Sequence, residues 1–151
     1  MFLCYLILSM ALKIIEHGSD DYRRMVKLRD DILRKPLGLN FSEQELEDEK
    51  KHILIGAFED DDILACCMLV EEDPSTVRLR QMAVLNDLQG KGIGRALMNF
   101  AENIARDRGY KCISMHARKN VTGFYEKMGY VVSGNEFIEI TIPHLQMDKQ
   151  L

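Results

Sequence analysis

Three glycines that alternate with other residues lie between two segments of different apolar pattern. Gly90, Gly92 and Gly94 belong to the run QGKGIGR over residues 89–95. Residues 77–84 before the run alternate between apolar and polar types, as a half-buried strand does. A helix N-terminus carries unpartnered N–H groups and partial positive charge, and glycines let a bulky anion approach the backbone without meeting a Cβ. The run therefore predicts a phosphate-binding turn at the start of a helix.

The segment after the glycines supplies that helix. Its apolar residues recur at i, i+3, i+4, i+7, i+8, i+11 and i+12, which makes one stripe on a helix surface. The members of the stripe are Ile93, Ala96, Leu97, Phe100, Ala101, Ile104 and Ala105. The spacing predicts a helix over residues 93–105 that buries one face.

The glycine run excludes two common phosphate motifs and matches a third. A P-loop requires G-x-x-x-x-G-K-[ST], which the run lacks. The dinucleotide fingerprint G-x-G-x-x-G fails because its last position falls on Arg95 or on Leu97, depending on the starting glycine. The run does match Q/R-x-x-G-x-G/A over residues 89–94. Here the chain resembles the GNAT superfamily of acyl-CoA-dependent N-acetyltransferases.

A second segment adds to this resemblance. Residues 120–130 read NVTGFYEKMGY. This is similar to the N-x-x-A-x-x-F-Y-x-K-x-G-F segment of the family, with Gly123 at the usual alanine place and a shorter spacing from Asn120 to Phe124. Two motifs at this separation are more specific than either motif alone.

The resemblance implies a binding site for acetyl-CoA, the acetyl donor of GNAT enzymes. In that family the glycine loop wraps the pyrophosphate, and the backbone of the strand before it pairs with the pantetheine arm. The cofactor-binding residues implied are Met82, Ala83, Val84, Gln89, Gly90, Lys91, Gly92, Ile93, Gly94, Arg95, Ala96, Asn120, Phe124 and Tyr125. The N–H of Val84 would donate to the thioester oxygen, and Tyr125 would donate a proton to the departing thiolate.

The sequence leaves the residue that deprotonates the acceptor open. An alkyl ammonium has a pKa of about 10.4, so it must lose a proton before it attacks a thioester. The candidates for this base are His116, His144, Glu136 and Glu139, and a base acting through water is a further alternative. Arg29 and Arg34, on the first predicted helix, could line the acceptor pocket, or they could be solvated charges.

The composition is that of an ordinary globular chain. The 151 residues are 46% hydrophobic and 29% charged, which excludes the disordered and membrane classes and predicts one domain over residues 1–151. The net charge of −4 gives no electrostatic reason to expect a nucleic-acid partner. We interpret residues 1–9, which precede the first predicted strand, as an extension or a mis-assigned start.

The cysteines predict reduced thiols and a cytoplasmic protein. Cys66 and Cys67 are adjacent, Cys4 and Cys112 lie far from them, and the sequence has no C-x-x-C. We therefore expect neither a disulfide framework nor a metal site, and we interpret Cys112 as a small core residue.

The predicted elements follow the order β-α-α-β-β-β-α-β-α-β-β. The predicted strands are residues 11–16, 53–58, 63–71, 77–84, 111–117, 130–133 and 137–142. The predicted helices are residues 20–35, 42–51, 93–105 and 120–128, the first capped by Ser19, the second by a Ser42–Glu45 capping box and the last by Asn120. This is the element order of the GNAT fold, so we expect an α/β (α+β) chain with a mixed, twisted central sheet of six to seven strands and helices on both faces.

Together these features predict an N-acetyltransferase. The expected reaction is direct attack of a primary amine of a small molecule on acetyl-CoA in a ternary complex. A peptide or protein N-terminus is the alternative acceptor, and a homodimer is a plausible assembly. A non-catalytic acyl-CoA-binding regulator and a nucleotide-dependent oxidoreductase remain as alternatives from other classes.

Overall fold

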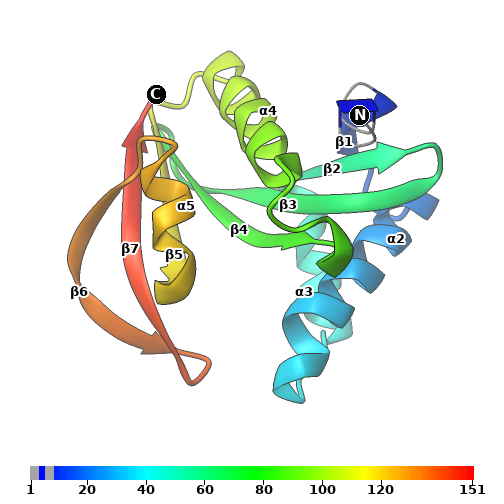
Figure 1. Ribbon diagram of the computed structural model, residues 1–151, viewed down its shortest axis with the longest axis horizontal. Coiled ribbons are helices and arrows are strands. Elements are labelled where there is room, and N and C mark those ends of the chain that lie inside the picture. Colours follow the sequence, from blue (N-terminus) through cyan, green and yellow to red (C-terminus); the bar gives the residue numbers. More distant parts are fainter. Residues whose placement is uncertain (1–3, 6–8) are drawn as a thin grey trace. The chain divides into compact units, whose positions relative to one another are not determined.

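Seven strands form one mixed sheet in the order β1-β2-β3-β4-β5-β7-β6 (Figure 1). The computed structural model describes residues 4–5 and 9–151, so most of the interpretation of residues 1–9 lies outside the described residues. The strands are β1 Ala11–Ile15, β2 Ile53–Glu59, β3 Asp62–Asp73, β4 Thr76–Val84, β5 Cys112–Arg118, β6 Val131–Glu139 and β7 Ile142–Gln150. β4 and β5 pair in parallel, whereas β1–β2, β2–β3, β5–β7 and β6–β7 pair antiparallel. The predicted seven-stranded mixed sheet is confirmed.

The chain forms two compact units. The first comprises the described residues up to Leu69 together with Gln81–Ala101, and the second comprises Val70–Arg80 together with Glu102–Leu151. Three elements, β3, β4 and the long helix α4 (Ile93–Asp107), contribute residues to both units. The expected single domain over residues 1–151 stays a prediction.

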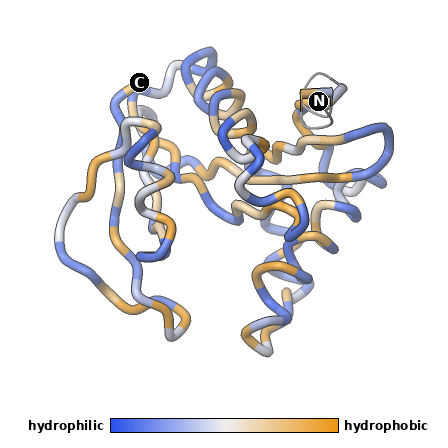
Figure 2. Tube along the Cα trace, in the orientation of Figure 1, coloured by the Kyte–Doolittle hydropathy of each residue, from blue (hydrophilic) through white to orange (hydrophobic). Residues whose placement is uncertain are grey.

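The core of the first unit is the β2–β3 hairpin. Five consecutive residues of β2 and six of β3 are buried, and the acidic turn between the strands is exposed. Figure 2 shows this turn in the hydrophilic colour and the strands that lead to it in hydrophobic colours. The predicted hairpin is therefore confirmed, because a continuous apolar run bounded by a polar turn is typical of a strand buried on both faces.

The first helix is shorter than predicted. α2 spans Asp20–Arg29, and Ser19 is its N-cap. The Ser19 hydroxyl accepts from the N–H of Tyr22, as the capping prediction requires. A π-helical turn then covers Asp30–Arg34, where the N–H of Lys35 donates to the carbonyl of Asp30 five residues earlier. The chain leaves the helix through a 3₁₀ turn that contains Pro36. Residues 30–35 therefore continue the helical path in a wider form that the 3.6-residue pattern does not reveal.

The second helix begins as predicted. α3 spans Glu43–Asp48, and Ser42 and Glu45 form both hydrogen bonds of the capping box. A 3₁₀ turn over Glu49–Lys51 completes the segment.

Helix α4 carries the predicted stripe and two buried residues outside it. The buried members of the stripe are Ile93, Leu97, Ala101, Ile104 and Ala105, and Met98 and Glu102 are buried beside them. In Figure 2 hydrophobic and hydrophilic colours alternate along its turns, as expected for an amphipathic helix. The helix starts at Ile93, directly after Gly92, so the glycine run occupies the position predicted for it.

The predicted bounds of the two C-terminal strands are wrong. β6 runs from Val131 to Glu139 with a register shift after Ser133, and β7 extends over Ile142–Gln150 (Figure 1). The turn between them is Ile140–Thr141, and both residues have positive φ, 49° and 62°. A two-residue hairpin turn needs such angles, but β-branched residues rarely adopt them. The prediction of a strand over residues 137–142 therefore crossed a turn that lacks the usual Asn-Gly signal.

Candidate active site

The glycine run presents backbone N–H groups at the start of α4. Gly90 and Gly92 have φ of 76° and 86°, in the left-handed region that favours glycine. Among the described residues, no backbone N–H from Gly90 to Arg95 donates to a protein group, and the next N–H along the chain, that of Ala96, donates to the carbonyl of Gly92 at 3.1 Å. Lys91 and Arg95 are exposed beside them. The run is thus a set of unpartnered donors with added positive charge, as an anion site requires.

Gln89 braces the beginning of this run. Its side-chain amide donates to the carbonyl of Val84 at 3.2 Å and to Oδ1 of Asn86 at 3.1 Å. The N–H of Leu85 donates to the carbonyl of Leu64 at 2.9 Å. The end of β4 is therefore fixed to both β3 and the loop, so Gln89 acts on the shape of the turn through its side chain.

The strand before the run contains an irregularity that the sequence does not signal. Gln81 has φ of 57°, in the middle of β4. The pairing of β4 with β5 runs from Thr76 with Cys112 to Leu79 with Met115, on the N-terminal side of Gln81. Beyond it lie the three residues that the family resemblance assigns to pantetheine, with Ala83 buried and Met82 and Val84 half-buried. The positive φ of Gln81 could not be predicted, because the alternation of apolar and polar residues does not depend on the backbone angle of one residue.

Tyr125 lies on α5, a short helix over Thr122–Glu126. Its side chain is buried, and its ring packs edge-on against Tyr130, with centroids 5.8 Å apart. Phe124 is largely exposed and lies edge-on to Tyr125 at 5.0 Å. Gly129, with φ of 93°, ends the segment, as predicted.

The predicted cap of this helix is wrong. A 3₁₀ turn covers Lys119–Val121, so α5 begins only at Thr122 and the N-cap position falls on Val121, which makes no side-chain capping bond. The Thr122 hydroxyl instead donates to the carbonyl of Lys119 at 3.0 Å. Asn120 is exposed within the 3₁₀ turn.

A buried charged network holds the C-terminal end of α5. The Lys149 ammonium donates to Glu102 at 2.9 Å and to the carbonyl of Met128 at 2.7 Å, and the Tyr130 hydroxyl donates to Glu102 at 3.0 Å. Glu102 is almost fully buried on α4. Because Tyr130 packs on the Tyr125 ring, this network sets the position of Tyr125 within the second unit.

Three of the four candidate bases form one cluster. Nδ1 of His116 lies 3.2 Å from Oε1 of Glu139, and Nε2 of His144 lies 3.8 Å from Oε2 of the same carboxylate. The Phe137 ring packs edge-on to His116 and stacks on His144, with centroids 4.9 Å and 5.9 Å away. The register of β5, β7 and β6 brings these side chains to one sheet face. We call His116, Phe137, Glu139 and His144 the imidazole–carboxylate cluster.

The fourth candidate lies outside the cluster. Glu136 pairs with the Lys119 ammonium at 2.7 Å, and both side chains are well exposed. A carboxylate in an exposed ion pair is an ordinary surface group.

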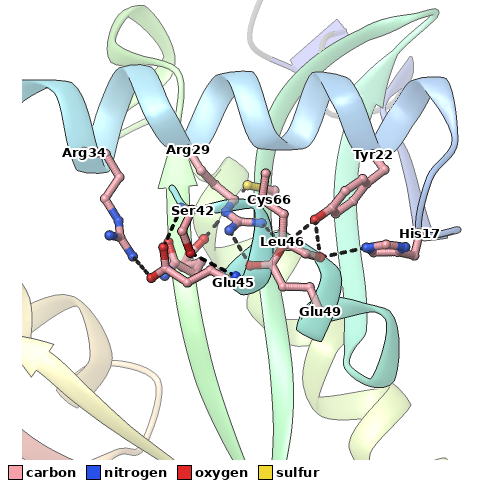
Figure 3. A network of polar contacts seen from close by, with 10 residues as sticks. His17, Tyr22, Arg29, Arg34, Ser42, Glu45, Leu46, Glu49 and Cys66 are labelled. Atoms are coloured by element: carbon pink, nitrogen blue, oxygen red, sulfur yellow. Dashed lines mark hydrogen bonds and ion pairs between the residues drawn. The ribbon is translucent and has the colours of Figure 1, made fainter. Parts of the chain in front are cut away.

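Arg29 and Arg34 are engaged within the first unit (Figure 3). Arg29 is fully buried and donates to both oxygens of Glu49, at 2.9 and 2.6 Å, and its guanidinium lies 4.6 Å from the Phe41 ring. The Arg34 guanidinium lies 4.3 Å from the centroid of the same ring, and it pairs with the Glu45 carboxylate at 3.5 Å. The interpretation of Arg29 as a solvated charge is therefore wrong, and a lining role for either residue stays a prediction.

Tyr22 completes the buried pair. Its hydroxyl donates to Glu49 at 2.7 Å. Burial, and then this bond to the carboxylate, raises the pKa of Tyr22 well above its ordinary value. Tyr22, Arg29 and Glu49 thus tie α2 to the turn after α3.

The buried cysteines are unsuited to carry an acyl group. All four cysteines are free. Burial raises the pKa of Cys66 to about 12 and that of Cys67 well above its ordinary value. Burial, and then the charge of Asp148, also raises the pKa of Cys112, which is half-buried rather than a full core residue. Because the thiolate is the nucleophile, these three thiols are poor nucleophiles at neutral pH.

The described residues offer neither a metal-binding cluster nor a membrane-spanning helix. Over residues 4–5 and 9–151, no group of three or more His, Cys, Asp or Glu side chains could hold a metal ion. No helix in that part of the chain is both long enough and apolar enough to cross a membrane.

Solved structures share this fold. A crystal structure from Lactobacillus plantarum is 22% identical with a TM-score of 0.84, and the match covers 95% of this chain and 99% of that one. A GNAT acetyltransferase from Elizabethkingia anophelis, solved with acetyl-CoA bound, is 18% identical with a TM-score of 0.71, and covers 95% of this chain and 99% of its own. At 18% and 22% identity, these likenesses show that the chain shares the fold of these solved structures.

The sequence comparisons give the family. The family model described as acetyltransferase (GNAT) domain matches residues 38–151, and the chain belongs to this family. YjcF of Bacillus subtilis, an uncharacterized N-acetyltransferase, is 27% identical over 139 residues, which cover 90% of this chain and 97% of YjcF. Two other curated relatives from the same organism are 32% identical, and there the chain spans about half of their length, 51%.

The glycine at position 92 provides a first test of the anion site. Gly92→Val places a β-branched side chain at a φ of 86°, which costs on the order of 1–3 kcal/mol of strain and covers the donors. We expect the affinity for coenzyme A to fall by about tenfold or more, measured by calorimetric titration. Gly18→Val is the matched control, because Gly18 has a φ of 83° with open space around it, far from the run. Equal losses of affinity in both variants would show that the strain alone is responsible.

Proposed function

We propose that the chain transfers acetyl from acetyl-CoA to a primary amine of a small molecule, by direct attack in a ternary complex. The observation that carries the proposal is the row of N–H groups at the positive-φ glycines before α4, which donate to no group among the described residues. Hydrogen bonds to charged groups contribute roughly 1.5–3 kcal/mol each, so several donors aimed at one pyrophosphate can anchor a large coenzyme.

The roles in the reaction follow from the residues assigned by the family resemblance. Residues 82–84 pair with the pantetheine arm, and the N–H of Val84 stabilises the oxyanion that forms when the amine attacks. Tyr125 donates its phenolic proton to the departing thiolate. The raised pKa values of Cys66, Cys67 and Cys112 support direct attack over an acyl-cysteine intermediate.

A homodimer and a cytoplasmic location complete the proposal. β6 is the last strand in the sheet order, and it exposes two-thirds of the surface of Val131 and Ile138. Edge strands with apolar side chains favour pairing with a second chain. Free cysteines are typical of reducing compartments, which supports the cytoplasmic assignment.

A screen of acceptors tests the function. The chain is incubated with acetyl-CoA and a panel of alkyl amines, polyamines, amino acids, aminoglycosides and short peptides, and release of free thiol is followed. We expect turnover with at least one small primary amine. Turnover restricted to peptides would replace the small-molecule acceptor by a peptide or protein N-terminus. Tight coenzyme binding without turnover on any acceptor would indicate a non-catalytic regulator.

A further inference from the structure

The imidazole–carboxylate cluster has the geometry of an oriented general base. We propose that His116 takes the proton from an alkylammonium acceptor through Nε2, with Glu139 and His144 as positioning residues. This inference rests on the proposed function, because it supplies the deprotonation step that acetyl transfer to an amine requires.

The contact with Glu139 fixes which nitrogen of His116 carries hydrogen. An ionised carboxylate only accepts hydrogen bonds, so Nδ1 of His116, 3.2 Å from Oε1, carries the hydrogen. Nε2 of the neutral ring then holds the free lone pair. A carboxylate that holds a histidine in one tautomer and stabilises its protonated form is the arrangement by which serine hydrolases orient their base.

His144 occupies the other oxygen of the same carboxylate. Its Nδ1 lies 2.7 Å from the carbonyl of Ile142, which can only accept, so Nδ1 carries hydrogen there too. Its Nε2 faces Oε2 of Glu139 at 3.8 Å. An imidazole therefore lies near each carboxylate oxygen of Glu139, and His144 attracts this carboxylate only when its Nε2 also carries a proton.

Burial separates the roles of the two histidines. The His144 side chain is 9% exposed, whereas the His116 side chain is 24% exposed. Phe137 lies against both rings. His116 is thus the imidazole that a substrate can reach, and His144 is a support for Glu139.

The neighbours on this sheet face are known from the register. Gln146 lies opposite His116 on β7, and Arg118 of β5 lies opposite His144. Asp148 and Ser114 form the next pair, with Arg78 of β4 beside Ser114. Glu136 is paired with Lys119. Among these described groups Glu139 is the carboxylate that pairs with His116, so it stabilises the imidazolium.

Acetyl transfer to an alkylammonium requires two proton losses from the nitrogen and one proton gain by the sulfur. The ammonium gives one proton to Nε2 of His116, and the amine lone pair forms the C–N bond to the thioester carbonyl. Collapse breaks the C–S bond, the thiolate takes a proton from Tyr125, and the nitrogen releases its second proton, which restores the phenol. His116 then returns its proton to solvent, so each turnover releases one proton in total.

Two probe amines of similar size separate a base from a structural residue. Ethylamine is an ammonium at neutral pH, whereas 2,2,2-trifluoroethylamine is mostly neutral and needs no base before attack. Each is assayed, with the fastest amine of the screen, against wild type, His116→Gln, Glu139→Gln and the matched control Glu136→Gln. Coenzyme A binding to each variant is measured by thermal shift as the test of folding.

We expect His116→Gln to lower kcat/KM by about a hundredfold for the ammonium acceptors and by less than about threefold for trifluoroethylamine. Glu139→Gln should lower it by about tenfold and move the acid limb of the pH–rate profile to lower pH, because the imidazolium loses its counter-charge, whereas Glu136→Gln should match wild type. Equal losses for charged and neutral amines, or full activity of His116→Gln, would overturn this assignment and leave the acetyltransferase intact. A wild type that turns over no amine would instead contradict the proposed function.

Discussion

Tyr125→Phe should lower kcat for acetyl transfer by about a hundredfold or more and leave the affinity for coenzyme A within about twofold. The substitution removes only the hydroxyl, and the ring keeps its edge-on contact with Tyr130. A thiolate that departs without a proton donor raises the barrier of the step in which the C–S bond breaks. The measurements are steady-state thiol release and calorimetric titration with coenzyme A.

Tyr110→Phe is the matched control for this prediction. The Tyr110 hydroxyl donates to Glu71 at 3.1 Å, and Tyr110 lies outside both GNAT motifs. Its removal should change neither rate nor affinity. If Tyr125→Phe retained full turnover, the proton would have to come from another group, and the role of Tyr125 would be limited to packing.

Glu49→Gln should destabilise the chain by about 3–5 kcal/mol. The reason is that Arg29 is fully buried, and its charge is compensated by Glu49 through two short hydrogen bonds. With the carboxylate neutralised, the guanidinium remains in the core without a counter-charge. We expect the midpoint of thermal unfolding to fall by roughly 10 °C, since a chain of this size loses about 2–4 °C per kcal/mol.

Glu47→Gln provides the comparison. Glu47 forms an exposed pair with Lys50 on the same segment, and such pairs contribute about 0–1 kcal/mol. Equal midpoints for the two variants would mean that the buried pair is not a determinant of stability.

Local signals in the sequence predicted where three helices begin. Ser19 and the Ser42–Glu45 box act within one turn of the chain, and the structure confirms both caps. The stripe after Gly92 likewise depends on spacing along one helix, and α4 begins where the stripe begins. These predictions succeeded because the residues that determine each feature are neighbours in the sequence.

The remaining features depend on residues that are distant in the sequence. The pairing of Arg29 with Glu49 could not be predicted, because it requires the turn after α3 to meet α2. His116, Glu139 and His144 were separate candidates, and only the register of three strands brings them to one carboxylate. The turn at Ile140 could not be predicted for a different reason. A β-branched residue disfavours the positive φ that Ile140 adopts.

The most direct test of the central claim compares two diphosphate-containing ligands. In the proposed function, the N–H groups of residues 90–95 bind the pyrophosphate of acetyl-CoA. The midpoint of thermal unfolding is measured for the wild-type chain alone, with coenzyme A and with NAD. At a hundredfold excess over its dissociation constant, coenzyme A should add about 2.7 kcal/mol and raise the midpoint by roughly 5–10 °C, and NAD should leave it unchanged. Stabilisation by NAD and not by coenzyme A would contradict the account.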